Sequence, residues 1–333
     1  MIVNLPDSIP SDGSREVSND LNNWLASVAD SASVVFPPDG VFWCDDTLEL
    51  IGKTGFRIYG CGSRFVRRNQ LAGFKNDVRA RIHWLFSGCQ DFAVYEVNVE
   101  GQANPPYGYD SSKEAQHGFS FLSCRDGELI ESSVTDVWGD AINFACDASY
   151  TPTTGIEVYG FKSGCVLRDS VSLTFADNIT LKGCEFGHSW RSGVDLEPNA
   201  SFWKVSNILF DRCDWKSYRL NWVAAGNTNT PGVVTDVTFS SCSTRQIKVG
   251  VACDQTQGSR ANFTVDSCVG RESVGGPNGA AIWIQDVDGF VTIKNNVCPL
   301  QAGRTPPMRV ARFDDYTTAN ATITYEGNTQ DLG

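Results

Sequence analysis

The sequence predicts an all-β protein that folds as a single parallel β-helix of about ten coils. Short strand-like segments, in which apolar residues alternate with polar ones, recur along the whole chain. Their ends lie between 23 residues apart (Phe161 to Cys184) and 36 residues apart (Cys61 to Val97), a period typical of repeat architectures. Clusters of Gly, Asn, Asp and Ser separate the segments, without a strong helical pattern between them.

The clearest copies of the segment end on cysteine, as in NITLKGC, which ends at Cys184. Sliding this register along the chain marks one position per coil: Cys61, Val97, Ser133, Phe161, Cys184, Cys213, Cys242, Cys268, Asn296 and Asn328. Equivalent residues of a parallel β-helix stack about 4.8 Å apart. We therefore expect the cysteines to form a buried column, not a metal site, because Cys-x-x-Cys spacing is absent. The two asparagines are expected to form an amide ladder. Cys44 and Cys253 fall outside the column, and we assign them no role.

Composition excludes several classes of protein. The formal net charge of −12 argues against a nucleic-acid partner, which requires a basic face. No apolar run reaches the length of a membrane span, about 20 residues. The first residues, MIVNLPDSIPSDGS, do not resemble a signal peptide, so we expect the 12 cysteines to be reduced thiols.

A helix is expected near the N-terminus, where Val17, Leu21 and Trp24 follow helical spacing and Ser14 or Ser18 is the candidate N-cap. Residues 1–32 are interpreted as an N-terminal segment with a short capping helix, and residues 33–333 as the β-helix domain.

The segment after this helix reads VVFPPDGVF, then IYGCG, and RSGVDLEPN follows later in the chain. Together with the repeat, these motifs resemble the pectate-lyase-like superfamily of right-handed parallel β-helices. The resemblance implies a right-handed helix whose first coil is covered by the N-terminal helix, which hides strand edges. It also implies a carbohydrate-active protein, of the glycoside hydrolase or the phage tailspike and depolymerase kind.

Stacking the coils on the register above places polar residues in one column, next to apolar residues that point inward. We expect this column to face solvent. Its members are Asp136, Asp140, Asn143, Arg168, His188, Arg191, Asp195 and Glu197, with the rings of Trp138, Trp190 and Tyr218 nearby. Carboxylates beside exposed aromatic rings suit a glycan, because the rings pack on sugar C–H faces while carboxylates bind hydroxyls. Insertions that could wall such a groove lie at roughly residues 63–80, 99–116, 145–153, 225–232 and 270–279.

Glycoside hydrolysis requires two carboxyl groups that flank the scissile bond. Asp140 and Asp195 are the candidate pair, about 9.6 Å apart if they lie two coils apart, with Asp136 or Glu197 as the alternative partner. His188 and Arg191 would bind substrate or shift a carboxyl pKa. The remaining polar and aromatic residues of the column are candidate substrate-binding residues. The alternative interpretation is structural: such columns also pair one coil with the next without taking part in chemistry.

The motifs depart from those of polygalacturonase-like members, which carry an Asp-Asp pair and Gly-His-Gly. Here WGDAINF has one aspartate and His188 is followed by Ser189. Lyases of this fold use an Arg or Lys base with Ca²⁺, so Arg191 near Asp140 and Asp195 leaves a lyase or epimerase open; hydrolysis would need no cofactor.

The leading hypothesis is a protein that binds and cleaves a polysaccharide, carried on a phage tail, where a homotrimer or other virion proteins would be its partners. One alternative is a structural or receptor-binding tail protein without catalysis. Another is a secreted enzyme whose signal peptide is absent from this sequence.

Overall fold

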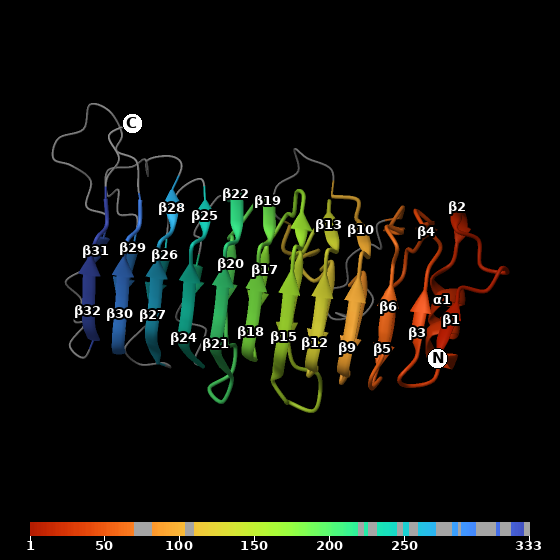
Figure 1. Cartoon of the computed structure of the whole chain (residues 1–333), viewed down its shortest axis with the longest axis horizontal. Helices are drawn as coiled ribbons and strands as arrows, with labels where there is room; N and C mark the ends of the chain where they lie inside the picture. The colour runs from red at the N-terminus through yellow and green to blue at the C-terminus, as the bar shows by residue number, and fades with distance from the viewer. Residues whose placement is uncertain are drawn as a thin grey trace.

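The computed structural model describes residues 1–69, 82–103, 110–218, 223–225, 232–244, 249–252, 259–270, 282–285, 288–297, 311–313 and 321–329. These residues form one right-handed parallel β-helix, whose strands lie side by side along the long axis of the molecule (Figure 1). All strand pairs within its three sheets are parallel, which confirms the expected fold class.

Each coil passes through sheet A, then sheet B, then sheet C. Sheet A comprises β1 (Ile2–Asn4), β3 (Ser33–Val35), β6 (Arg57–Tyr59), β9 (Gln90–Tyr95), β12 (Arg125–Ile130), β15 (Thr153–Tyr159), β18 (Ala176–Lys182), β21 (Lys204–Asp211), β24 (Val233–Ser240), β27 (Arg260–Asp266), β30 (Asp288–Lys294) and β32 (Ala321–Glu326). Sheet B comprises β2 (Asp12–Glu16), β4 (Val41–Trp43), β7 (Arg64–Val66), β10 (Asn98–Glu100), β13 (Ser133–Thr135), β16 (Lys162–Ser163), β19 (Glu185–Ser189), β22 (Asp214–Tyr218), β25 (Ser243–Thr244) and β28 (Val269–Gly270). Sheet C comprises β5 (Leu48–Ile51), β8 (Trp84–Ser87), β11 (Phe119–Leu122), β14 (Ile142–Ala145), β17 (Val171–Leu173), β20 (Val194–Leu196), β23 (Val223–Ala225), β26 (Val249–Ala252), β29 (Ile282–Gln285) and β31 (Ala311–Phe313).

The corner from sheet A to sheet B carries the predicted column. Cys184, Cys213, Cys242 and Cys268 are buried free thiols. The Sγ of Cys213 lies 3.4 Å from the carbonyl of Leu181 in the preceding coil, and later cysteines repeat this contact. Asn296 takes the same place and donates to the Oδ1 of Asn328 at 2.9 Å. The core column and the amide ladder are therefore confirmed.

Two positions of the predicted column were wrong. Ser133 pairs with Lys162, and Lys162 with Glu185, so the residue in line with Cys184 is Ser132. In the first coil, Arg64 pairs with Asn98, which places buried Ser63, and not Cys61, opposite Val97. The predicted position in the first coil is displaced because this corner contains two additional residues, Cys61 and Gly62, both with positive φ (51° and 79°).

Helix α1 (Ser18–Ser27) covers the N-terminal end of the core. Its N-cap is Val17 rather than a serine, and the Glu16 carboxylate accepts the N–H of Ser18 at 2.9 Å. Leu21 and Trp24 are buried, as their spacing indicated, and so is Leu25. Sheets A and B already begin before this helix, with β1 and β2. No helix in the described part of the chain is long and apolar enough to cross a membrane.

Sheet C starts later, at β5, and α1 protects its first edge. The side chain of Asn22 donates to the carbonyl of Thr47 at 2.8 Å and accepts the N–H of Glu49 at 2.9 Å. One amide side chain thus satisfies two backbone groups that a neighbouring strand would otherwise bind.

Replacing Asn22 with alanine is expected to lower the free energy of unfolding by about 1–3 kcal/mol, because it leaves these two backbone groups without their partner. Urea unfolding measures this change. Asn23→Ala is the matched control, since Asn23 is exposed on the same helix and should change stability by less than about 0.5 kcal/mol. Equal effects for both variants would contradict the edge-capping role.

Candidate functional site

A column of polar side chains runs across the outer face of sheet C. Ser120, Asn143, Ser172 and Asp195 are in register on consecutive strands, while their neighbours point into the core. The Oγ of Ser120 donates to Asn143 at 3.0 Å, and Asn143 donates to the Oγ of Ser172 at 2.8 Å. Contrary to expectation, all four side chains are buried, so the column is not a freely solvated surface.

A second row lies where the chain enters sheet C, and it contains a residue that the sequence analysis missed, Asp169. The Oδ1 of Asp140 accepts the N–H of Asp169 at 3.0 Å, and the Oδ1 of Asp169 accepts the N–H of Ser192 at 2.7 Å. Each carboxylate thus ties its own coil to the next. Counting from Ser132 instead of Ser133 would have aligned Asp140 with Asp169.

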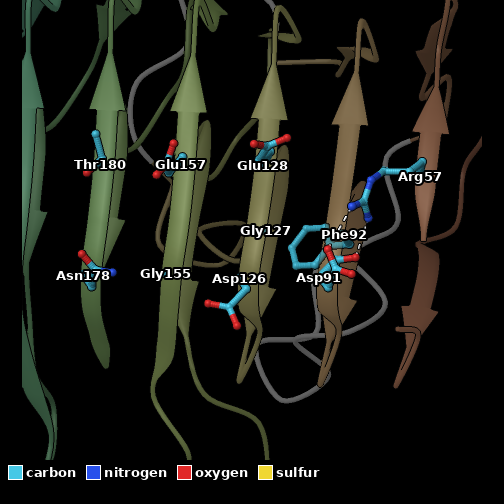
Figure 2. A pocket seen from close by; sticks show the side chains of 10 residues that line it. All are labelled: Arg57, Asp91, Phe92, Asp126, Gly127, Glu128, Gly155, Glu157, Asn178 and Thr180. Carbon is cyan, nitrogen blue, oxygen red and sulfur yellow. Dashed lines mark hydrogen bonds and ion pairs between the residues drawn. The ribbon is translucent and has the colours of Figure 1, made fainter. Parts of the chain in front are cut away.

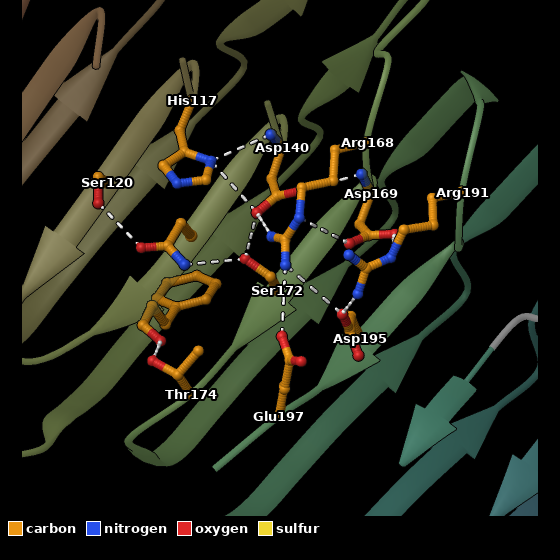
Figure 3. Close-up of polar contacts among 12 residues, drawn as sticks. His117, Ser120, Asp140, Arg168, Asp169, Ser172, Thr174, Arg191, Asp195 and Glu197 are labelled. Atoms are coloured by element: carbon orange, nitrogen blue, oxygen red, sulfur yellow. Dashed lines mark hydrogen bonds and ion pairs between the residues drawn. The ribbon is translucent and has the colours of Figure 1, made fainter. Parts of the chain in front are cut away.

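Two arginines join the rows into one group, which we call the charged cluster. It consists of His117, Asp140, Arg168, Asp169, Arg191, Asp195 and Glu197 (Figure 3).

Arg168 is the centre of the charged cluster. Its Nη1 lies 2.6 Å from Asp140 Oδ2, and its Nε lies 3.6 Å from Asp169 Oδ2. Its Nη2 lies 3.8 Å from Asp195 Oδ2 and 3.3 Å from Glu197 Oε2. Because both oxygens contact the same nitrogen, they are at most 7.1 Å apart, the sum of those two distances.

Arg191 and His117 complete the charged cluster. Arg191 Nη2 pairs with Asp195 Oδ2, and its Nε lies 3.5 Å from Asp169 Oδ1. The Nδ1 of His117 lies 3.0 Å from the backbone nitrogen of Asp140 and 3.2 Å from its Oδ2. His117 was also missed, because it lies outside the repeated pattern and its contact with Asp140, 23 residues later, has no signal in the sequence.

The carboxyl groups of the charged cluster differ in pKa. Burial raises the pKa of Asp140, but the Arg168 guanidinium and hydrogen bonds to His117 and Ser172 outweigh it, so the net pKa lies below the ordinary value. Burial, together with the negative charge of Glu197, raises the pKa of Asp195 to about 6. Burial and the charges of Asp195 and Asp140 raise the pKa of Asp169 well above its usual range. Neighbouring carboxyl groups in different protonation states are what acid–base chemistry requires.

The side chains of the charged cluster also differ in their exposed fraction. Asp140 has no exposed surface and Asp195 only 3%, whereas the side chains of Glu197 and Arg191 are 23% and 24% exposed. A ligand on this face would meet Glu197 and Arg191 first and Asp195 after a small displacement. Asp140 lies behind them, as a residue that holds Arg168 and the backbone.

The other predicted site residues lie around sheet B and the turn that follows it. Asp136 is half-buried at the end of sheet B, and burial raises its pKa.

Trp138 is buried in a small apolar group with Trp190, and Lys113 Nζ lies 3.8 Å from its ring centroid, so Trp138 offers no open face. His188 is half-buried on β19 with its ring edge-on to Trp190, and burial lowers its pKa. Tyr218 ends β22, and its side chain lies outside the described residues.

A separate cavity of about 330 Å³ lies on the outer face of sheet A (Figure 2). Its walls include Arg57, Asp91, Asp126, Glu128 and Glu157. The Asp91 and Asp126 side chains are 69% and 70% exposed, so these carboxylates are hydrated and are not held in a buried network like that of the charged cluster. We therefore place the candidate site on sheet C and not in this cavity.

Within the described ranges, no group of three or more His, Cys, Asp or Glu side chains is arranged to hold a metal ion. In the charged cluster, the guanidinium groups of Arg168 and Arg191 supply the positive charge beside the carboxyl groups.

No protein-family model matches the sequence, and a search of curated proteins finds no match. Solved structures show the fold clearly. The endo-xylogalacturonan hydrolase of Aspergillus tubingensis matches with a TM-score of 0.71 at 10% identity, over 98% of this chain and 92% of that chain. A tailspike from an Acinetobacter baumannii bacteriophage, a capsular polysaccharide depolymerase, matches with a TM-score of 0.56 at 11% identity, over 98% of this chain and 63% of that one. The Streptococcus pneumoniae surface adhesin PfbA matches with a TM-score of 0.55 at 11% identity, over 98% and 92%. At these identities the likeness establishes the right-handed parallel β-helix.

Proposed function

We propose that this protein binds a polysaccharide along the outer face of sheet C and hydrolyses a glycosidic bond there. The observation that carries the proposal is the pair Asp195 and Glu197, whose oxygens lie within 7.1 Å of each other on one arginine nitrogen, with the pKa of Asp195 at about 6. A carboxyl group that can donate a proton near neutral pH, with a second carboxyl group within this range, is the requirement of glycoside hydrolysis. Solved structures of the same fold include a polysaccharide hydrolase and a polysaccharide depolymerase.

In this mechanism protonated Asp195 donates its proton to the glycosidic oxygen as the bond to the anomeric carbon breaks. Glu197 acts on the other face of the sugar, either as the base that takes a proton from the attacking water or as the nucleophile that water later displaces. An upper limit of 7.1 Å between the two oxygens is compatible with both the inverting and the retaining mechanism. The configuration of the released anomer distinguishes the two mechanisms. The predicted pair Asp140 and Asp195 is thereby revised: Asp140 keeps Arg168 in place, and no cofactor is needed.

A second candidate function is binding without cleavage. The near-complete burial of Asp195 favours it, because a side chain with 3% exposure must move before it can reach a glycosidic oxygen. An adhesin among the solved structures of like fold is compatible with that role.

Incubation with polygalacturonan, xylogalacturonan, Acinetobacter capsular polysaccharide and a neutral glucan tests both functions. New reducing ends are the expected result and indicate a hydrolase. Absorbance of an unsaturated uronate would indicate a lyase, for which Ca²⁺ would be examined, and binding without product would indicate an adhesin. Absence of both binding and product would contradict the proposal.

The setting that we propose is a phage tail, with a homotrimer or other virion proteins as partners, and secretion is the alternative. The support is the tailspike of like fold. Light scattering of the purified chain measures the oligomeric state directly.

A further inference from the structure

Four aromatic rings gather at the corner where sheet C passes into sheet A, and we call them the aromatic platform: Tyr150, Phe175, Phe202 and Trp203. Tyr150 precedes β15 and Phe202 precedes β21. The two rings meet edge to face with centroids 6.0 Å apart. Phe175 and Trp203 stack below them at 5.8 Å, and Phe202 stands edge-on to both.

The outer two rings are unusually exposed. Tyr150 is 60% and Phe202 62% exposed, more than any other large apolar side chain of the described residues except those of Met1 and Ile2. Exposed aromatic pairs of this kind mark binding surfaces more often than isolated apolar residues do.

The backbone holds the aromatic platform firmly. Trp203 donates its N–H to Ala200 at 2.9 Å, and Gly232 of the next coil donates to Pro198 at 3.2 Å. In the other loop, Tyr150 donates its N–H to the carbonyl of Asp147 at 3.1 Å, and the Asp147 carboxylate accepts from Ser87 and other hydroxyls. Rings held in place before binding lose little conformational entropy when a ligand packs on them.

The aromatic platform continues the outer face that carries the charged cluster. Glu197, directly after β20, donates its backbone N–H to the carbonyl of Leu173 at 2.9 Å, so it lies beside Thr174, directly after β17 (Figure 3). Phe175 follows Thr174 directly, and Phe202 follows Glu197 by five residues. A linear ligand that passes Glu197 toward the corner therefore reaches these rings next.

We propose that the aromatic platform is a glycan-binding subsite that holds a pyranose residue of the polysaccharide beyond the residue at Glu197. This inference rests on the proposed function and extends it. The C–H face of a pyranose ring packs on the exposed rings, and the polar side chains of Ser149, Asn199 and Ser201, all exposed on the same loops, can bind its hydroxyls. A protein partner fits less well, because two exposed rings supply a small part of the roughly 800 Å² that each side of a stable interface buries.

The test compares Phe202→Ala and Tyr150→Ala with the unmodified protein on the polysaccharide that it cleaves. Each variant is expected to raise KM or Kd for the long polymer about five- to tenfold, with kcat unchanged. KM for the shortest oligosaccharide that the protein cleaves should not change. Phe202→Tyr should keep the affinity, while Phe202→Leu, which retains apolar volume without a ring, should lose it. Phe290→Ala, which removes a 46% exposed ring from sheet A, is the matched control and should change nothing.

Unchanged polymer affinity in both alanine variants, with cleavage intact, would overturn the subsite and leave the proposed function standing. A change in oligomeric state instead of affinity would overturn it in favour of a protein interface. If the unmodified protein neither binds nor cleaves any polysaccharide tested, both the subsite and the proposed function fail.

Discussion

Asp195→Asn and Glu197→Gln are each expected to lower kcat by about 10²–10⁴-fold, with KM changed much less. Both substitutions keep the shape of the side chain and remove its ability to exchange a proton. Reducing-end assays on the responsive polysaccharide measure the loss. Thermal unfolding should show that the fold survives, because an amide can still accept hydrogen bonds from Arg168 and Arg191.

Glu128→Gln is the matched control for this prediction. Glu128 lines the cavity on sheet A, so its substitution should leave kcat unchanged. If Glu128→Gln removed activity while Glu197→Gln did not, the active site would belong to sheet A.

The pH profile gives a second readout of the same assignment. Asp195 must be protonated to act as the acid, and burial beside Glu197 raises its pKa to about 6. Activity should therefore be present below about pH 6 and fall as the pH rises through that value. This limb of the profile should disappear in any residual activity of Asp195→Asn, and its persistence would assign the acid to another group.

Arg168→Met is expected to have the largest effect on stability. It removes the cation that contacts Asp140, Asp169, Asp195 and Glu197, and it leaves the fully buried Asp140 carboxylate without an arginine partner. Removing one partner of a buried ion pair costs about 3–5 kcal/mol. Urea unfolding at neutral pH measures this loss.

The stabilisation that Arg168 contributes also depends on pH in a definite direction. Arg168 keeps the folded-state pKa of Asp140 below its ordinary value, so this stabilisation is present above the unfolded-state pKa and is lost as the pH falls. The difference in free energy of unfolding between Arg168→Met and the unmodified protein should therefore shrink in mild acid, because the Asp140 carboxyl group of the variant becomes protonated there. Arg64→Met is the control: its ion pair with Glu100 is about half exposed and should contribute less than about 0.5 kcal/mol at any pH. An equally small effect of Arg168→Met would contradict the central role of this arginine.

The repeated pattern in the sequence predicts the fold and the core column, apart from the positions of Ser132 and Ser63. Alternating strands with a recurrent Cys or Asn place one side chain per coil at the same corner, and stacking of identical short units leaves few other ways to bury them. The amide ladder of Asn296 and Asn328 and the buried faces of Leu21 and Trp24 follow from the same local patterns.

The candidate site, in contrast, depends on how the coils stack. A shift of one residue, Ser132 instead of Ser133, hid the alignment of Asp140 with Asp169, because corner insertions do not alter the alternation on either side of them. Alternation also indicates which side chains point outward but not what covers them, so Asp195 was expected in solvent and is instead buried against two arginines. Contacts between residues some 28 positions apart depend on the exact length of each coil, and the pKa values that those contacts set exist only once the coils are stacked.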